Sequence, residues 1–387
     1  MRNAVLVIAC ALVALTVGIF LGGHPGTLPG PVRDAFVEED RALRSEIVDT
    51  INDNFYKKVD ESKLDDASLK GIVESLEDPY SHYLTPEEAK SFQESVSGEF
   101  EGVGMNVEKD TRGLRVLNVF DGSPAEKAGI RKQDLILSVD GRSIAGLSSD
   151  VATGRIKGPA GSKVNLEVYT PGAADSRRVS VERDRIEVPV ATSRVVERDG
   201  HELGVVRLLG FSSGAHGVLR REIDEVLDKG ADALLLDLRG NGGGLLSEAV
   251  LVSSIFIEDG EIVSVRGRAR PERTEDAEGK AIDPDIPVVV LVDGGSASAS
   301  EIVTGALRDR GRATVVGTNT FGKGLVQEVE PLSNGGYLDL TVANYYLPSG
   351  KTIGKGGLKP QVKAIDKPRT KRDEALPVAL DVLLGKL

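Results

Sequence analysis

The chain has 387 residues, of which 40% are hydrophobic and 28% are charged, so it can bury a full core and is long enough for two or three domains. Its 60 acidic residues against 48 Lys and Arg give a net charge of −12, which argues against a broad electrostatic grip on nucleic acid. The single cysteine, Cys10, excludes an internal disulfide framework and multi-cysteine metal sites. We therefore expect a folded protein of more than one domain, with no nucleic-acid partner.

The first element expected along the chain is a membrane segment at residues 1–23. Residues 3–23 carry no charge and are almost wholly apolar, and about 20 helical residues cross a bilayer core of about 30 Å. Residues 21–25 offer no small-x-small cleavage site, which favours an uncleaved anchor through residues 4–23 over a cleaved signal peptide. Because Arg2 precedes the segment, the bulk of the chain is expected outside the cytoplasm. This indicates a single-pass cell-membrane protein, with a secreted or periplasmic protein after signal cleavage as the alternative.

Residues 33–96 are expected to form a helical region. Apolar residues recur there at spacings of four and seven, which predicts one apolar stripe on a helix: Phe36, Leu43, Ile47, Ile51 and Phe55. The stripe fits equally a helix packed on its own core and a face that joins two copies as a homodimer. A second helix is expected after Thr85, with Pro86 at its first position and Glu88 completing a capping box.

Residues 97–185 are predicted to form a separate small unit. Its signals are a glycine-rich run at 101–105, a short helix between caps at Ser123 and Gly129, and the Asp140-Gly141 turn. Strands are expected at 114–116, 134–139, 164–169 and 178–181, and a helix at 149–157. This order of elements resembles a PDZ domain along its whole length. In that family a glycine-rich loop offers backbone N–H groups to the terminal carboxylate of a peptide that adds to the sheet. The resemblance assigns that role to Gly102, Val103, Gly104 and Met105.

Residues 186–365 alternate between predicted strands and helices. Continuous apolar runs typical of buried strands occur at 204–209, 233–238, 288–292 and 313–316. Helices are expected at 217–227, 245–256 and 298–308. The pattern predicts an α/β core.

One short motif in this core matches a catalytic pattern that the rest of the chain does not complete. Residues 210–214 spell the G-x-S-x-G string around Ser212, between a strand and a helix. The hydrolases that use this string need a histidine downstream, and none follows His216. Ser212 is therefore expected to cap a helix instead.

Two further motifs are incomplete as well. Residues 317–323 spell a phosphate loop, but Gly324 replaces the magnesium-binding Ser or Thr and no helix is expected to follow. His201 and Glu202 begin a zinc-protease motif that lacks its second histidine. No metal site and no cofactor are expected.

The fourth motif is the serine-rich run Ser296–Glu301. A serine before a helix, with glutamate three residues on, is first of all a capping box. Lys323 follows later with Gln327 four residues beyond it, so on an extended strand Lys323, Leu325 and Gln327 share one face. A Ser–Lys pair can make a hydroxyl nucleophilic without histidine if desolvation lowers the pKa of the amine from about 10.4 toward about 7–8. The alternatives for the nucleophile are Ser296, Ser298 and Ser300.

Three runs together carry a family resemblance: Leu236–Gly244, Ser296–Glu301 and Phe321–Gln327. They resemble the carboxyl-terminal processing proteases, also called tail-specific proteases, and shorter runs at 77–84 and 346–351 match as well. The resemblance covers about residues 33–365. It implies a serine endopeptidase with a ClpP/crotonase-like α/β core, an inserted PDZ domain and a helical N-terminal region. Beyond it, the basic run at 367–372 indicates a solvated tail before a short terminal helix within residues 366–387. The resemblance also implies protein or peptide substrates recognised by their C-termini, and no cofactor.

Carried over residue by residue, the resemblance makes Ser298 the nucleophile, Lys323 the general base and Gln327 the residue that orients the amine. The oxyanion hole falls on the backbone N–H groups of Ala299 and of a glycine in the 242–244 run, with Gly244 the best fit. The chain departs from the family pattern at Gly242, where proline is usual, and at Gln361, where an acidic residue is usual. A non-catalytic PDZ scaffold on a protease-like core and an NTPase are the alternative functions.

Overall fold

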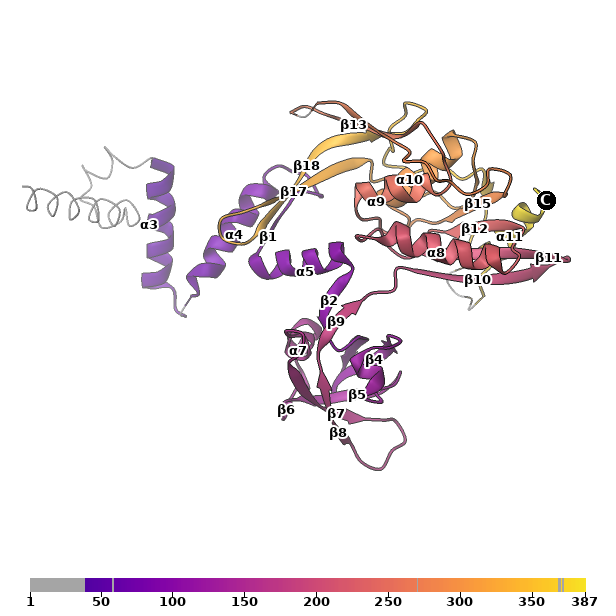
Figure 1. Cartoon of the computed structure of the whole chain (residues 1–387). Coiled ribbons are helices and arrows are strands. Elements are labelled where there is room, and N and C mark those ends of the chain that lie inside the picture. The colour runs from indigo at the N-terminus through magenta and orange to yellow at the C-terminus, as the bar shows by residue number, and fades with distance from the viewer. Residues whose placement is uncertain (1–38, 58, 270, 368–369, 371) are drawn as a thin grey trace, which may run out of the picture.

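The structure is a computed structural model that describes residues 39–57, 59–269, 271–367, 370 and 372–387 (Figure 1). The predicted membrane segment, residues 1–23, lies outside this part of the chain. None of the helices in the described ranges combines the length and the apolar character that a bilayer crossing requires.

The N-terminal region contains α3 (Glu39–Asn54), α4 (Glu61–Glu74), β1 (His82–Leu84) and α5 (Pro86–Ser97). Its helices confirm the prediction, and β1 is an addition that the helical pattern did not signal. Phe36 of the predicted apolar stripe lies outside the described residues, and Ile51 is half-buried. The other three members, Leu43, Ile47 and Phe55, keep exposed fractions of 56%, 51% and 52%. In the single chain the stripe therefore does not pack on a core of its own, and the dimer face stays a prediction.

The predicted capping box fixes the start of α5. Thr85 Oγ1 accepts the N–H of Glu88 at 3.3 Å, and the Glu88 carboxylate accepts the N–H of Thr85 at 2.8 Å. Pro86 takes the first helical position, and Gly98 ends the helix with φ of +72°. The position of α5 matters because its C-terminal residues line the large cavity described below.

The predicted small unit is present as a sheet in the order β3-β4-β5-β7-β8, with β6 paired to β5. Its elements are β3 (Met105–Asp110), β4 (Gly113–Val119), α6 (Pro124–Lys127), β5 (Leu135–Val139), β6 (Arg142–Ser143), α7 (Ser149–Ile156), β7 (Lys163–Tyr169) and β8 (Arg177–Glu182). Ser123 caps α6, and Asp140 and Gly141 have positive φ in the predicted turn. The antiparallel strands β2 (Glu99–Gly102) and β9 (Asp184–Glu187) connect this unit to the rest of the chain (Figure 1).

The core is a six-stranded sheet in the order β10-β11-β12-β15-β16-β19. Only β10 runs antiparallel to its neighbour in this sheet of described strands. The strands are β10 (Ala191–Arg198), β11 (His201–Leu208), β12 (Ala233–Asp237), β15 (Val288–Val292), β16 (Thr314–Gly317) and β19 (Val362–Lys363). Every residue of β12 and β15 is buried, which explains their continuous apolar sequences.

Helices cover both faces of this sheet. One face packs against α8 (Ala215–Asp228), α9 (Leu246–Ser254) and α10 (Ala299–Asp309). The other face packs against α11 (Ala375–Leu384). The predicted α/β core is confirmed, and the C-terminal helix is its second helical layer.

A second sheet joins the N-terminal region to the core. It consists of β1, β18 (Tyr337–Tyr346), β13 (Glu261–Gly267) and β14 (Arg273–Asp276) in that order, with β17 (Leu325–Pro331) also paired to β18. Figure 1 shows β17 and β18 reaching from the core toward α4 and β1. Residues 82–84 therefore lie against the strand pair that carries Gln327.

Candidate active site

Ser298 lies at the turn between β15 and α10. Its φ of +54° and ψ of −113° form a conformation that is costly for a residue with a Cβ atom. A strained strand-to-helix turn of this kind presents a serine hydroxyl above a sheet in the hydrolases that use the G-x-S-x-G string. Ser212 carries that string here, but it is not among the described residues with positive φ. The geometry of such a turn is therefore found at Ser298.

The serines on either side of Ser298 have other bonds. Ser296 Oγ donates to the carbonyl of Leu238 at 2.8 Å, and Ser300 Oγ donates to the carbonyl of Asn241 at 2.8 Å. Both serines are fully buried, whereas Ser298 is half-buried and lines the large cavity. Of the three candidates, Ser298 is the one whose side chain a substrate can reach.

The expectation that Ser212 caps a helix is wrong. Helix α8 begins after Gly214, which has no side chain to cap it. Glu248 from α9 takes this role, because its carboxylate accepts the N–H groups of Gly214 at 2.8 Å and His216 at 2.9 Å. A buried glutamate on a neighbouring helix has thus replaced the local cap.

The other two incomplete motifs lie in elements that do not suit them. Lys323 is followed by strand β17, so no helix N-terminus follows the phosphate-loop string. His201 and Glu202 begin strand β11, not a helix. The structure thus agrees with the interpretation that both matches are accidental.

Glu301 ties the turn at Ser298 to the loop that carries Lys323. Its carboxylate is fully buried and accepts four hydrogen bonds. The donors are Ser298 N at 2.9 Å, Lys323 N at 2.9 Å, Gly322 N at 2.8 Å and Thr320 Oγ1 at 2.5 Å. The sequence marked Glu301 only as a capping residue; its contacts with residues 320–323 depend on the fold.

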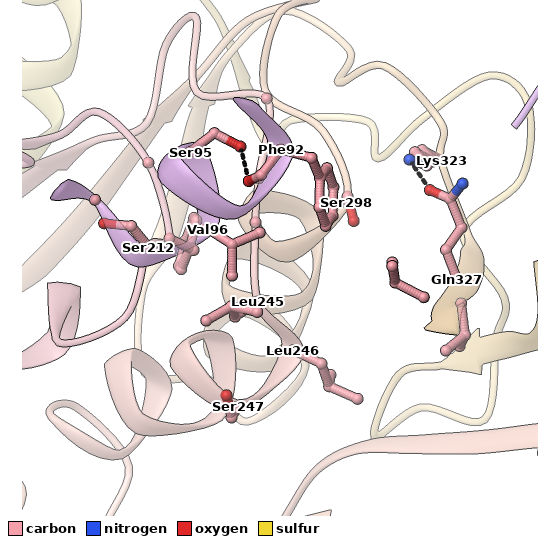
Figure 2. Close-up of a pocket in the computed structure, with 18 of the residues that line it drawn as sticks. Phe92, Ser95, Val96, Ser212, Leu245, Leu246, Ser247, Ser298, Lys323 and Gln327 are labelled. Atoms are coloured by element: carbon pink, nitrogen blue, oxygen red, sulfur yellow. Dashed lines mark hydrogen bonds between the residues drawn. The ribbon is translucent and has the colours of Figure 1, made fainter. Parts of the chain in front are cut away.

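Lys323 lies just before β17, and its ammonium group donates to Gln327 Oε1. Lys323, Leu325 and Gln327 all line the large cavity, as expected for residues on one face. The ladder between β17 and β18 is irregular between Val326 and Gln327. Figure 2 shows Lys323 joined to Gln327 by a hydrogen bond, with Ser298 as a separate side chain in the same cavity. Among the described residues no hydrogen bond joins Lys323 to Ser298.

The surroundings of Lys323 favour its neutral form. Burial lowers the pKa of the Lys323 amine from its ordinary value, while the negative charges of Asp339 and Asp78 oppose this effect. The ring of Tyr80 lies 5.1 Å from Nζ. The net direction is the one that a lysine acting as a base requires.

The cavity that contains these residues has a volume of about 940 Å³. Apolar side chains form much of its wall, including Phe92, Val96, Leu245 and Leu246, which Figure 2 labels together with Ser298 among the lining residues. The wall also includes the 188–190 segment that follows β9. The cavity therefore extends from Ser298 to the connection with the small unit, a size and position that suit a peptide segment.

The glycine run 242–244 packs directly against the turn at Ser298. A Cβ atom on Gly243 would lie 2.9 Å from Ser298 Cβ and 3.0 Å from Ala299 N, so only glycine fits there. The N–H of Gly243 already donates to Asn241 Oδ1 at 2.9 Å. No hydrogen bond of the N–H groups of Gly244 and Ala299 is found among the described residues. The choice of Gly244 for the oxyanion hole thus stays a prediction.

Arg239, three residues before the glycine run, joins three carboxylates. Its guanidinium pairs with Asp237 at 2.8 Å, with Asp366 at 2.8 Å and with Asp373 at 2.9 Å. Asp366 in turn accepts the N–H groups of Glu374 and Ala375 at the start of α11. The segment before the C-terminal helix is therefore bound to the run Leu236–Gly244.

The predicted carboxylate loop of the small unit lies against α6. The carbonyls of Val103 and Gly104 accept the N–H groups of Ala125 at 2.8 Å and Phe120 at 3.0 Å. The loop is covered on one side, because a Cβ atom on Gly102 would lie 3.0 Å from the ring of Phe100. Lys157, at the end of α7, lies over that ring at 5.2 Å and pairs with Glu94 of α5 at 2.5 Å.

Comparison with known proteins identifies three regions of the chain. Residues 202–364 match peptidase family S41, residues 102–182 match the PDZ domain, and residues 41–88 match the N-terminal domain of the activating protease CtpB. The chain is 37% identical over 360 residues to the carboxy-terminal processing protease CtpA of Bacillus subtilis, covering 93% of this chain and 76% of that protein. It is also 37% identical to the carboxy-terminal-processing protease of Bartonella bacilliformis, covering 87% and 77% of the two chains.

A solved structure agrees in fold. The crystal structure of a protein described as an S41 protease from Bacteroides fragilis superposes with a TM-score of 0.54 at 20% identity, over 86% of this chain and 92% of that one. Fold and sequence together define the class, a serine-type peptidase that carries a PDZ domain. Within that class, the chain belongs to the carboxy-terminal processing proteases of peptidase family S41. The predicted enzyme class is thereby confirmed, and the scaffold and NTPase alternatives are not supported.

Proposed function

We propose that the protein is a membrane-anchored, extracytoplasmic endopeptidase in which Ser298 attacks the peptide bond, Lys323 accepts its proton and Gln327 orients the amine. The observation that carries this proposal is the shared cavity. A serine on a positive-φ turn and a half-buried lysine, with its pKa lowered by burial, line the same space. A neutral amine can take the proton of a hydroxyl, and desolvation supplies the neutral form.

The proposed reaction begins with attack of Ser298 Oγ on the scissile carbonyl carbon. The hydroxyl proton passes to Lys323 Nζ, and negative charge develops on the carbonyl oxygen. The N–H groups of Ala299 and Gly244 are the proposed donors to this oxyanion. Breakage of the C–N bond returns the proton from Lys323 to the leaving amine, and water activated by the same amine then hydrolyses the acyl-serine. In the first step the Nζ lone pair faces Ser298 while one Nζ hydrogen still donates to Gln327 Oε1, an approach that the flexible lysine side chain allows.

Recognition of the substrate C-terminus is proposed for the loop Gly102–Met105. Support comes from the match to the PDZ family and from the loop's own bonds. Its carbonyls at Val103 and Gly104 are used by α6 and its neighbours, whereas no bond of the N–H groups of these two residues is found in the described part of the chain. Backbone N–H groups that are left without a partner in a glycine-rich loop suit a terminal carboxylate.

The site of action is proposed from the N-terminal sequence. The charge-free run of residues 3–23 behind Arg2 supports an anchor through residues 4–23, with the catalytic portion outside the cytoplasm. Signal cleavage would instead leave a secreted or periplasmic enzyme. Mass spectrometry of the N-terminal peptide from the membrane fraction distinguishes the two, because an anchored chain retains residues 4–23.

The decisive test of the catalytic assignment is a pair of substitutions in the full-length chain. Ser298→Ala is expected to abolish cleavage of a peptide without changing the thermal unfolding temperature by more than a few degrees. Lys323→Arg is expected to be as damaging as Lys323→Ala, because a guanidinium stays protonated at any working pH. Lys132→Arg, at an exposed position, is the matched control. Substantial turnover by Lys323→Arg would mean that another group takes the serine proton.

The pH dependence gives a second test of the base. Since Lys323 acts when neutral, kcat/KM is expected to rise with pH through the lowered pKa of the amine and to stay high in mildly alkaline solution. A histidine base with an ordinary pKa of about 6.5 would level off earlier. A profile that is flat above neutrality, with its only rise near that value, would contradict a lysine base.

A further inference from the structure

Gln327 is held by residues from two segments to which the sequence assigned no catalytic role. One is β18, where Asp339 lies diagonally across the ladder from Gln327, because Gln327 pairs with Thr341 and Val329 pairs with Asp339. The other is the segment that precedes β1, which contains Tyr80. The pairing of His82 with Asp339 brings the two segments together.

The amide of Gln327 makes three hydrogen bonds that fix its orientation. Nε2 donates to Asp339 Oδ2 at 3.1 Å and to the backbone carbonyl of Tyr80. Oε1 accepts from Lys323 Nζ. An amide can flip by exchanging its oxygen and nitrogen, but a flipped Gln327 would point its oxygen at a carboxylate and a carbonyl, neither of which can donate. The two acceptors therefore keep Oε1 facing the lysine.

Tyr80 itself is held in place by neighbouring bonds. Its N–H donates to Asp78 Oδ1 at 3.3 Å, and Ser81 Oγ donates to Asp78 Oδ2 at 2.6 Å. Ser81 Oγ also accepts the N–H of Thr341 on β18 at 3.1 Å. The carbonyl that receives the Gln327 amide is thus fixed to the same strand that carries Asp339.

We propose that Asp339 is a positioning residue of the active site, which with the Tyr80 carbonyl holds the Gln327 amide so that its oxygen faces Lys323. The proposal rests on the proposed function, in which Lys323 is the base. Asp339 lines the catalytic cavity, and its Oδ1 atom is buried with no hydrogen-bond partner among the described residues. A carboxylate oxygen buried without a partner is costly, so a purely structural role would favour an apolar residue there.

The charge of Asp339 also affects the pKa of Lys323, although the Gln327 amide separates the two side chains. Burial raises the pKa of Asp339, while the charge of Lys323 lowers it; the Asp339 charge in turn raises the pKa of Lys323 against the effect of burial. Other charged or titratable groups lie around this site. Asp78 and Tyr80, from the segment before β1, and Glu301 of α10 act on or contact Lys323. His82 of β1 acts on Asp339, and the cavity wall also contains Arg273 and Glu275 of β14 and Glu328 of β17. Gln327 is neutral and bonds to both Lys323 and Asp339. It can therefore hold the amine without adding another negative charge next to it.

Two substitutions in the full-length chain separate the hydrogen bond from the charge. Asp339→Asn keeps an oxygen that can accept the Gln327 amide but loses the charge. The acid limb of the kcat/KM profile is expected to move to lower pH by about 0.5–1 unit, with the plateau within about threefold of the wild type. Asp339→Leu loses both, so the same shift is expected together with a fall in kcat of about tenfold at unchanged KM. Asn344→Ala, an exposed position on the same strand, is the control.

The outcomes distinguish this proposal from the proposed function. A wild-type pH profile in Asp339→Asn, together with wild-type kcat in Asp339→Leu, would overturn the positioning role while Ser298 and Lys323 remain essential. Equal loss of kcat and melting temperature in both variants, without a shift of the acid limb, would also overturn it, because a merely structural carboxylate behaves in that way. Activity of Lys323→Arg would instead remove the base itself.

Discussion

The turn that carries the proposed nucleophile, Ser298, and the PDZ unit are held by different kinds of contact. The turn at Ser298 is fixed by a fully buried carboxylate with four donors and by a glycine run packed against it. The PDZ unit connects through the β2–β9 pair and a half-exposed ion pair between Lys157 and Glu94. Buried networks are strong and insensitive to salt, whereas exposed pairs contribute little and are screened. The turn at Ser298 is thus held by contacts that salt does not weaken, while the ion pair of the PDZ unit is of the weaker, exposed kind.

The largest effect is expected from breaking the buried side of this comparison. Glu301→Gln replaces one acceptor oxygen by an NH₂ group that faces backbone and hydroxyl donors. Each buried donor left unpaired costs about 1–3 kcal/mol, so we expect unfolding free energy to fall by about 2–4 kcal/mol and kcat to fall by about 100-fold. Denaturant unfolding and peptide cleavage measure the two effects. Glu197→Gln, on an exposed part of β10, should change neither.

The glycine run allows a matched pair of substitutions. Gly243→Ala would place a Cβ atom 2.7 Å from the carbonyl oxygen of Ala297 at a φ of +100°, so the turn at Ser298 must shift. We expect kcat to fall by at least about tenfold. A Cβ atom on Gly242 would have no other atom within 4 Å, and Gly242 is not among the glycines with positive φ. Gly242→Ala should therefore stabilise the fold by about 0.4–1 kcal/mol at unchanged kcat/KM. Equal kcat for the two variants would show that the contact does not set the turn.

A smaller effect is expected at the recognition loop. Amidation of a substrate's C-terminus removes the charge that the N–H groups of residues 102–105 would stabilise. A charge-assisted hydrogen bond contributes about 1.5–3 kcal/mol, so the affinity of the full-length Ser298→Ala chain for the amide should be about tenfold or more lower. Isothermal titration with matched free-acid and amide peptides tests this. Equal affinities would argue against carboxylate recognition by this loop.

The smallest effect is expected at the ion pair between the PDZ unit and α5. Lys157→Met and Glu94→Gln should each change the free energy of unfolding by less than about 1 kcal/mol, because both side chains are partly exposed. A double-mutant cycle, measured at low and at high salt, gives the coupling directly. A coupling energy above about 2 kcal/mol that persists in high salt would show that the Lys157–Glu94 pair is as strong as a buried contact. The proposed difference between this pair and the Glu301 network would then be wrong.

Much of the fold could be predicted from local sequence. The buried strands β12 and β15 read as apolar runs because both of their faces are covered, and the caps at Thr85 and Ser123 act over three residues. Strand β1 was not predicted, since its three residues take their conformation from pairing with β18. The cap proposed for Ser212 failed for a related reason, because its replacement, Glu248, comes from another helix.

The candidate site was only partly readable from the sequence. The run Ser296–Glu301 and the spacing of Lys323 and Gln327 indicated the chemistry, but the bonds that hold these residues cross large sequence distances. Gln327 reaches Tyr80 over 247 positions. Neither spacing nor periodicity carries information about such a contact. The residues proposed to orient the base could therefore be found only from the sheet that joins β1, β18 and β17.

Two of the ion pairs of Arg239 can form only late in the synthesis of the described part of the chain. Asp366 and Asp373, which hold Arg239, lie more than a hundred positions after it, and α11 follows them. Ser298 and Lys323 have therefore already been synthesised when the last support of the run Leu236–Gly244 is still inside the ribosome. During translation the nascent chain thus has its proposed nucleophile and base before the residues that hold Arg239 emerge, so the run Leu236–Gly244 is supported only after both have been made.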